Sequence, residues 1–281
     1  MPKSVLITGC STGIGASLVT AFQKRGLTVF ATARKPAALS SFSALANVHI
    51  LALDVTSEAS VRDAYEEVRT KTGGKLDYLV NNAGMGHDLP ALDFPLEDAK
   101  KMFETNFWGT VRMCQVFAPL VIEAKGTIVN VGSVLGEMAM PYMSMYNASK
   151  AAVHLYGETL RLELAPFNVK VITIITGAIK TSFKANVPVP QLPPDSRYQP
   201  IKKNLEDISS GVNIKKAGSS DKFAEEVVAD VLRGVTGKVW RGPDSGLAKF
   251  GKTWFPTWLM DRILSDGSGL ETLTASKKKS V

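Results

Sequence analysis

Short apolar runs alternate with longer segments of helical periodicity along most of the chain. Six runs have the length and the continuous apolar character of buried strands, and they cover residues 3–8, 28–32, 49–53, 76–81, 126–131 and 169–175. Strands that are apolar on both faces are typical of a parallel sheet with helices on both sides. The pattern therefore predicts a sheet buried between two helical layers.

The intervening segments carry the spacing of amphipathic helices. A helix is predicted from Ile14, with Leu18 and Phe22 on the same face, and another follows the third strand. The longest helical segment covers residues 147–167. Strands that alternate with helices in this way predict an α/β fold with a doubly wound parallel sheet, of the Rossmann type that binds dinucleotides.

The region of residues 180–217 breaks this rhythm. It contains five of the chain's prolines and few periodic apolar residues. Because a loop of this length in a compact domain is usually functional, we interpret it as a lid over the substrate, with a surface insertion as the alternative. The predicted organisation is a catalytic domain at residues 1–245, including this lid, and an aromatic, basic extension with a flexible tail at residues 246–281.

Composition limits the location of the protein. The 281 residues are 45% hydrophobic, but no run approaches the roughly 18–20 apolar residues that span a bilayer. The chain enters a strand pattern at once, which leaves no room for a signal peptide, so we expect a cytoplasmic protein. Cys10 and Cys114 match no metal or redox spacing, and we expect no metal site.

The net charge is +7. Part of it lies in Lys277, Lys278 and Lys279, which we interpret as a solvated end and not as a nucleic-acid site. The remaining excess suits an anionic cofactor or an acidic membrane surface, and charge alone does not separate the two.

A glycine-rich loop joins the first strand to the first helix. Glycine allows a tight turn and a close approach of backbone to pyrophosphate, and the amides of the helix N-terminus then hold the phosphates. The candidate cofactor-binding residues of this loop are Gly9, Ser11, Thr12, Gly13, Ile14 and Gly15.

The second strand ends without the acidic residue that usually binds the ribose of NAD. In its place stand Ala33, Arg34 and Lys35. The absence of a carboxylate removes repulsion of a 2′-phosphate, and a guanidinium can bind such a phosphate through two hydrogen bonds. We therefore predict NADP(H) as the cofactor, contacted by Arg34 and Lys35.

Further cofactor contacts are expected at the carboxyl ends of the third and fourth strands. Such ends line the ligand crevice in open α/β sheets. The candidates are Asp54, Val55, Asn82, Ala83 and Gly84. Asp54 suits the adenine amino group, or alternatively a helix cap ahead of Thr56 and Ser57.

Tyr146 and Lys150 are four residues apart in a helical segment and so lie on one face. A free phenol has a pKa of about 10, and a positive charge within about 4–6 Å lowers it by roughly 1–3 units. This pair predicts a tyrosine that exchanges protons with a substrate.

Two polar residues complete the candidate site. Ser133 ends the fifth strand, thirteen residues before Tyr146, where its hydroxyl is placed to stabilise charge on a substrate oxygen. Asn106 lies in an apolar helical stretch, and it is either a holder of a water that relays protons to Lys150 or a satisfied structural amide.

Taken in order, these motifs resemble the short, single-domain branch of the short-chain dehydrogenase/reductase family. The resemblance rests on TGCSTGIG, LALDV, NNAG, Asn106, Ser133 and YNASK, and it covers roughly residues 3–181. It implies that Tyr146 is the proton donor or acceptor, Ser133 the stabiliser of the substrate oxygen, Lys150 a pKa modifier and ribose binder, and Asn106 a water holder.

The resemblance also implies nicotinamide contacts after the sixth strand, from Gly177, Ile179 and Thr181. This chain lacks the proline that often precedes this glycine in the family, and we expect altered loop rigidity without loss of hydride transfer. Several stretches resemble the fungal 1-acyldihydroxyacetone-phosphate reductases, a group that is itself similar to 17β-hydroxysteroid dehydrogenases. They are KLDYLVNNAG, AKGTIVNVGS, LRLELAPFNVKVITIITG and the late WRG and WFPTWLMDRIL.

We therefore predict an NADPH-dependent carbonyl reductase for a ketone or aldehyde. A lipophilic substrate is expected, such as acyl-dihydroxyacetone phosphate, a steroid-like ketone or a secondary-metabolite ketone, because methionines flank the strand ends and adapt to apolar ligands. These methionines are Met85, Met138, Met140, Met143 and Met145. The alternatives are a catalytically silent NADPH-binding sensor and a nucleotide-sugar epimerase or dehydratase.

Residues 247–264 combine apolar and basic side chains, including Trp254 and Trp258, and Pro256 prevents one continuous helix. This composition suits a peripheral contact with a membrane, on the endoplasmic reticulum or a lipid droplet, while closure of the substrate pocket or a subunit contact are the alternatives. We also expect a homo-oligomer.

Overall fold

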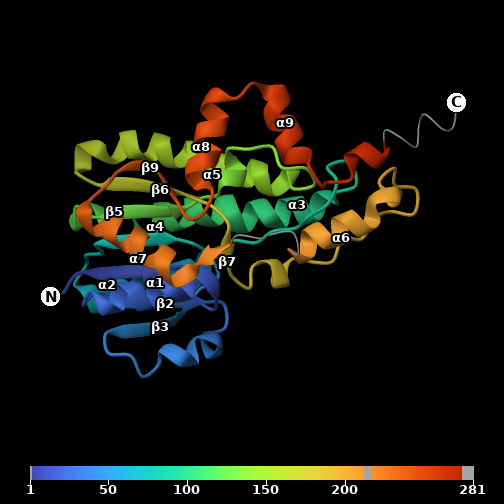
Figure 1. Ribbon diagram of the computed structural model, residues 1–281. Helices are drawn as coiled ribbons and strands as arrows, with labels where there is room; N and C mark the ends of the chain where they lie inside the picture. Colours follow the sequence, from blue (N-terminus) through green and yellow to red (C-terminus); the bar gives the residue numbers. More distant parts are fainter. Residues whose placement is uncertain (1, 212–216, 274–281) are drawn as a thin grey trace, which may run out of the picture.

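The structure, a computed structural model, describes residues 2–211 and 217–273, and it is built on one central sheet (Figure 1). Seven parallel strands form this sheet. In spatial order they are β3 (Val48–Ala52), β2 (Thr28–Ala33), β1 (Ser4–Ile7), β4 (Tyr78–Asn81), β5 (Thr127–Val131), β6 (Lys170–Thr176) and β9 (Gly237–Arg241). The order reverses between β1 and β4, so the predicted doubly wound α/β fold is confirmed.

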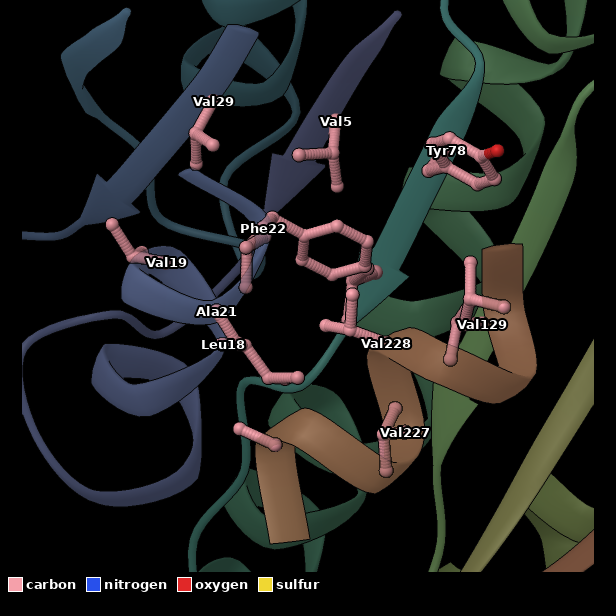
Figure 2. Close-up of a cluster of buried hydrophobic side chains, with 14 of the residues drawn as sticks. Val5, Leu18, Val19, Ala21, Phe22, Val29, Tyr78, Val129, Val227 and Val228 are labelled. Atoms are coloured by element: carbon pink, nitrogen blue, oxygen red, sulfur yellow. The ribbon is translucent and has the colours of Figure 1, made fainter. Parts of the chain in front are cut away.

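Helices cover both faces of the sheet. One face carries α1 (Gly13–Lys24) and α7 (Ser220–Arg233), and the other carries α2 (Glu58–Thr72), α4 (Gly109–Glu123) and α5 (Ser144–Leu164). Figure 2 shows how Phe22 of α1 and Val228 of α7 pack against sheet residues such as Val129. The apolar periodicity of these helices is therefore used to bury the sheet.

Local capping sets where several helices begin and end. The Ser57 hydroxyl accepts the backbone N–H of Ser60 at 3.3 Å and starts α2, which ends at Gly73 with a left-handed φ of 64°. The Ser219 hydroxyl accepts the N–H of Lys222 and starts α7. These are the side-chain caps and glycine stops that satisfy the free groups of helix ends.

The six predicted strands agree with the observed ones to within two residues at each end, but one strand of the central sheet, β9, and the short pair β7 (Ile179–Lys180) and β8 (Gly218–Ser219) were missed. β9 is partly polar and lies at the sheet edge, where only Val239 of its five residues is buried. The long helix α5 begins at Ser144, three residues before the predicted start, and therefore already contains Tyr146.

The predicted lid of residues 180–217 has more structure than its prolines suggested. Within it or beside it lie the helix α6 (Lys202–Ser210) and the strand pair β7 (Ile179–Lys180) and β8 (Gly218–Ser219). Four 3₁₀ turns lie elsewhere in the described chain: η1 (Pro36–Phe42), η4 (Ala165–Phe167), η5 (Lys184–Asn186) and η6 (Gln199–Ile201). A further 3₁₀ turn, η3 (Val134–Gly136), lies near the site. Residues 212–216 of the predicted lid lie outside the described residues, as do Lys277, Lys278 and Lys279 of the tail.

Two helices, α8 (Ser245–Trp254) and α9 (Thr257–Ser265), follow β9 and form a helical hairpin beside it (Figure 1). Pro256 separates them, as its position in the sequence predicted. Within residues 2–211 and 217–273, no helix combines the length and the apolar character needed to cross a membrane. The division of the chain at residue 245 stays a prediction.

Candidate active site

A large cavity of about 2430 Å³ opens at the carboxyl edge of the sheet. Most of the sequence-predicted site residues line it. These are Gly9, Ser11, Thr12, Gly13, Ile14, Gly15, Arg34, Asp54, Val55, Asn82, Ala83, Gly84, Ser133, Tyr146, Lys150, Gly177, Ile179 and Thr181. Two predicted residues, Lys35 and Asn106, are outside its wall. The fold thus brings together groups from the ends of six strands, β1 to β6, as expected for the crevice of an open α/β sheet.

The glycine loop is shaped so that side chains would not fit. A Cβ on Gly9, where φ is 71°, would lie 2.9 Å from Cα of Ala83, and a Cβ on Gly15 would lie 2.2 Å from the carbonyl oxygen of Gly9. Helix α1 begins directly behind this loop and has no acidic residue in its first turn. This tight backbone and the positive helix end form a cradle for an anionic group such as a pyrophosphate.

The loop is fastened to the neighbouring strand β4. Asn82 Nδ2 donates to the carbonyl oxygen of Thr8 at 2.8 Å, and the Thr8 hydroxyl accepts the backbone N–H groups of Asn82 and Ala83 at 2.9 Å each. The Asn82 side chain therefore supports the loop from behind.

Arg34 stands at the carboxyl end of β2, at the cavity wall. It is exposed and makes no ion pair with any residue in the described ranges 2–211 and 217–273. Asp54 also lines the cavity, and its Oδ1 accepts from the backbone N–H and the hydroxyl of Thr56 at 2.9 and 2.7 Å. Since Ser57 caps α2, Asp54 is not the helix cap.

Tyr146 and Lys150 lie one turn apart on α5, and both are buried. Lys150 Nζ is 5.8 Å from the centre of the Tyr146 ring and donates to the carbonyl oxygen of Val131 at 2.9 Å. Burial raises the pKa of Tyr146 to about 12, opposed by a hydrogen bond with Ser133, and burial lowers the pKa of Lys150 to about 8. The sequence suggested a lowered pKa for Tyr146, whereas burial in the protein chain raises this pKa.

Ser133 follows β5 and caps the 3₁₀ turn η3 (Val134–Gly136). Its Oγ accepts the backbone N–H of Leu135 at 3.1 Å. Because the oxygen is the acceptor in this bond, the hydroxyl can donate its proton to another group, such as the Tyr146 phenol or a ligand in the cavity. A hydroxyl held in this way can stabilise a partial negative charge on an oxygen in the cavity.

Asn106 is buried in a π-helical turn, η2 (Glu104–Trp108), between α3 (Leu96–Phe103) and α4. Its amide is used within the protein: Oδ1 accepts the N–H of Met85 at 2.8 Å, and Nδ2 donates to the Met85 carbonyl and to Ser149 Oγ, each at 3.0 Å. A Cβ on Gly84 would lie 3.3 Å from Asn106 Oδ1 and 3.6 Å from Lys150 Nζ. The position near Lys150 agrees with the expectation, and the water-holding role stays a prediction.

Two contacts of the predicted lid escaped the sequence analysis. Phe183 lies with its ring centre 5.8 Å from that of Tyr146, and Lys184 forms an ion pair of 2.5 Å with the buried Asp88. No local spacing signals these contacts, because 37 residues separate Phe183 from Tyr146 and 96 residues separate Lys184 from Asp88. Ile263 and Leu264 of α9 line the same cavity, which agrees with the alternative that residues 247–264 close the substrate pocket.

The methionines divide between the cavity and its surroundings. Met85, Met140 and Met143 line the cavity, Met138 lines a neighbouring smaller pocket, and Met145 packs in the apolar cluster beside Tyr146. With Phe183 they make the surroundings of the phenol largely apolar.

Comparison with known proteins places the chain in a family. The family model for short chain dehydrogenases matches residues 3–191. A short-chain dehydrogenase of Penicillium ochrochloron is 42% identical over 95% of this chain and 98% of its own length. The NADPH-dependent 1-acyldihydroxyacetone phosphate reductase of Schizosaccharomyces pombe is 44% identical, covering 79% of this chain and 76% of its own length.

A solved structure has the same architecture at a comparable size. The short chain dehydrogenase from Burkholderia cenocepacia J2315, crystallised in complex with NADP, superposes with a TM-score of 0.74 at 29% identity, covering 94% of this chain and 98% of that one. The cavity, the ordered motifs and these relatives lead to one conclusion. The chain belongs to the short chain dehydrogenase family of oxidoreductases.

Proposed function

We propose that this protein reduces the carbonyl group of a ketone or aldehyde to an alcohol with NADPH. The observation that carries the proposal is the convergence of Ser133, Tyr146 and Lys150 on the cavity whose other side is the glycine cradle. A proton donor, an oxygen-stabilising hydroxyl and a cofactor cradle in one cavity are the parts that carbonyl reduction needs.

Bound NADPH supplies the hydride for the carbonyl carbon. Tyr146 donates a proton to the carbonyl oxygen, and its raised pKa keeps the phenol protonated at neutral pH until then. Ser133 donates its free hydroxyl proton in a hydrogen bond to the same oxygen. Lys150 lies beside the Tyr146 ring and lowers the cost of negative charge on the phenol oxygen when the proton leaves.

The preference for NADPH rests on the end of β2. Arg34 carries a positive charge at the cavity wall with no protein partner in the described ranges 2–211 and 217–273, and Ala33 replaces a carboxylate that would repel a phosphate. The relative from S. pombe is NADPH-dependent, and the B. cenocepacia structure contains NADP. These features together favour a cofactor with a 2′-phosphate.

The substrate is proposed to be lipophilic. Phe183, Met85, Met140 and Met143 surround the phenol with apolar side chains, and Ile263 of α9 also lines the cavity. The S. pombe relative is named as a reductase of 1-acyldihydroxyacetone phosphate, a ketone that carries an acyl group and a phosphate. The apolar side chains around the phenol would contact the acyl group of such a ligand.

Following NADPH absorbance with acyl-dihydroxyacetone phosphate, steroid ketones and other lipophilic ketones tests this function. Tyr146→Phe is expected to lower turnover by at least about 100-fold, because the proton donor is lost, and to leave the NADPH dissociation constant within about threefold. Tyr65→Phe, on α2 against Phe117 and outside the cavity wall, is the matched control. Turnover of Tyr146→Phe within tenfold of wild type contradicts the mechanism.

We further propose that the α8–α9 hairpin makes peripheral contact with a membrane. Its outer side is apolar: Trp254 is 72% exposed and Trp258 66% exposed, beside exposed Leu247 and Phe250. Exposed Lys249 lies between them, and the other side of α9 lines the cavity. Tryptophan and lysine together favour the headgroup region, and an apolar substrate would then reach the cavity directly from the lipid.

Flotation with vesicles that contain acidic lipids tests the membrane contact. The wild type is expected to float, and Trp254→Ser with Trp258→Ser to reduce the bound fraction severalfold, because two interfacial rings are lost. Leu162→Ser with Phe167→Ser is the control, since both residues are also exposed but lie elsewhere, Leu162 near the end of α5 and Phe167 in η4. Equal flotation of both double variants, or none of the wild type, would assign the hairpin to the pocket or to a subunit contact.

A further inference from the structure

A buried histidine lies directly behind Ser133. His154 is on α5, one turn after Lys150, and its side chain is 2% exposed. Its Nε2 accepts the backbone N–H of Ser133 at 3.2 Å, so the ring proton is on Nδ1 and is donated to Glu137 Oε1 at 3.0 Å. Burial, with the charges of Lys150 and Lys238, lowers the pKa of His154 to about 3, so that the ring is neutral.

The backbone on both sides of Ser133 is shaped around this ring. A Cβ on Gly132 would lie 2.3 Å from His154 Nε2, and a Cβ on Gly136 would lie 2.5 Å from His154 Cε1. Both glycines have room for the ring only because they lack side chains. The imidazole therefore fills the space under the turn that carries the Ser133 hydroxyl, and it holds that turn by a hydrogen bond as well as by contact.

Glu137 connects this histidine to two further elements. Its side chain is 5% exposed, and besides His154 it contacts Lys238 of β9 at 2.5 Å and Lys252 of α8. A buried carboxylate is stable only with such partners, since removing one leaves a charge without compensation. Glu137 thus joins the turn after Ser133 to α5, to the last strand and to the hairpin that lines the cavity.

We propose that His154 and Glu137 are positioning residues that hold the Ser133 hydroxyl in place for the substrate oxygen, and that Lys252 links them to helix α8. The inference rests on the proposed function, because it assigns a role to the support of Ser133. The direction of the Ser133 Oγ follows from its backbone, which His154 holds, and from the bond to Leu135 N–H. A shift of about 1 Å in such a group costs on the order of 100-fold in rate.

The first test replaces the histidine. His154→Leu keeps an apolar side chain in the space but leaves the Ser133 N–H without its acceptor. We expect single-turnover hydride transfer to fall by about 10- to 100-fold, with the NADPH dissociation constant within about threefold of wild type. His154→Gln, which offers both an acceptor and a donor, is expected to recover a large part of the rate. If His154→Leu and His154→Gln lose the same share of the hydride-transfer rate while both melt at the wild-type temperature, the positioning role is overturned.

A double-mutant cycle shows whether His154 acts through Ser133. In a Ser133→Ala background, His154→Leu is expected to lower the rate by less than about threefold, because no hydroxyl is left to position. The same fold-loss in both backgrounds overturns the inference while the proposed function stands. If Ser133→Ala itself keeps the wild-type rate, the role of Ser133 fails and the inference fails with it.

Separate variants of Glu137 and Lys252 test the same proposal, and they keep it testable if the His154 variants do not fold. Glu137→Gln retains an oxygen that accepts from His154 Nδ1, and it is expected to lose less rate than Glu137→Leu. Lys252→Ala is expected to lower the rate by about two- to fivefold, whereas Lys71→Ala, at an exposed lysine of α2 outside the cavity wall, leaves it unchanged. Equal rates for these two lysine variants overturn the link to α8.

Discussion

Replacing Arg34 with alanine tests the choice of cofactor most directly. The side chain is exposed at the carboxyl end of β2 and lines the cavity. It has no ion-pair partner in the described part of the chain, so its removal leaves no protein group unpaired. The variant is expected to weaken NADPH binding and to leave NADH binding almost unchanged, because only the phosphorylated cofactor loses a contact.

The size of the effect follows from the exposure of Arg34. A hydrogen bond to a charged group contributes about 1.5–3 kcal/mol, and exposure to solvent and salt reduces this to about 1–2 kcal/mol here. Since about 1.4 kcal/mol corresponds to a tenfold change, the NADPH dissociation constant should rise by about 5- to 30-fold. The rise should shrink as salt is added, because screening weakens an exposed charge pair.

Titration of NADPH and NADH by protein fluorescence quenching measures both constants in the same preparation. Arg25→Ala is the matched control: it removes an exposed arginine at the opposite end of α1 and changes the net charge equally. Ala33→Asp should shift preference toward NADH, since its carboxylate repels a 2′-phosphate. Equal weakening of NADPH and NADH by Arg34→Ala would refute the argument and make Arg34 a structural residue.

Two further variants probe the support of the site. Lys150→Met should abolish turnover and raise the free energy of unfolding at pH 7 by about 2–3 kcal/mol, since the folded-state pKa of about 8 lies below the ordinary 10.5. The buried charge destabilises the wild type fully below pH 8, and this cost disappears as the pH rises toward 10.5. Urea unfolding of the wild type and Lys150→Met at pH 7 and above pH 10.5 checks the sign. The same difference in unfolding free energy at both pH values speaks against the argument. Gly15→Ala should weaken NADPH binding more than tenfold and lower the melting temperature, because its Cβ would lie 2.2 Å from a backbone oxygen. A Cβ on Gly246 would have open space around it, so Gly246→Ala should leave NADPH binding unchanged and stability equal or slightly higher. Similar losses of NADPH binding in Gly15→Ala and Gly246→Ala would refute the steric reason.

The parts of the site that depend on local sequence were predictable. A strand, a glycine loop and a helix in immediate succession place Gly9, Gly13 and Gly15 without any knowledge of distant segments. The spacing of Tyr146 and Lys150 puts them on one helical face, whatever else the chain does. Six of the seven strands were evident because each is continuously apolar, and a buried strand carries that signature by itself.

Contacts between distant segments were decided only by the tertiary structure. The polar edge strand β9, the packing of Phe183 against Tyr146 and the position of α9 at the cavity depend on how far-apart segments meet. The pKa of Tyr146 went against expectation for the same reason, since helix spacing reveals a nearby cation but not the extent of burial. His154 carries no motif, and its role follows only when the chain brings it under Ser133 and beside Glu137, because hydrogen bonds and desolvation act over a few ångströms in space and not along the sequence.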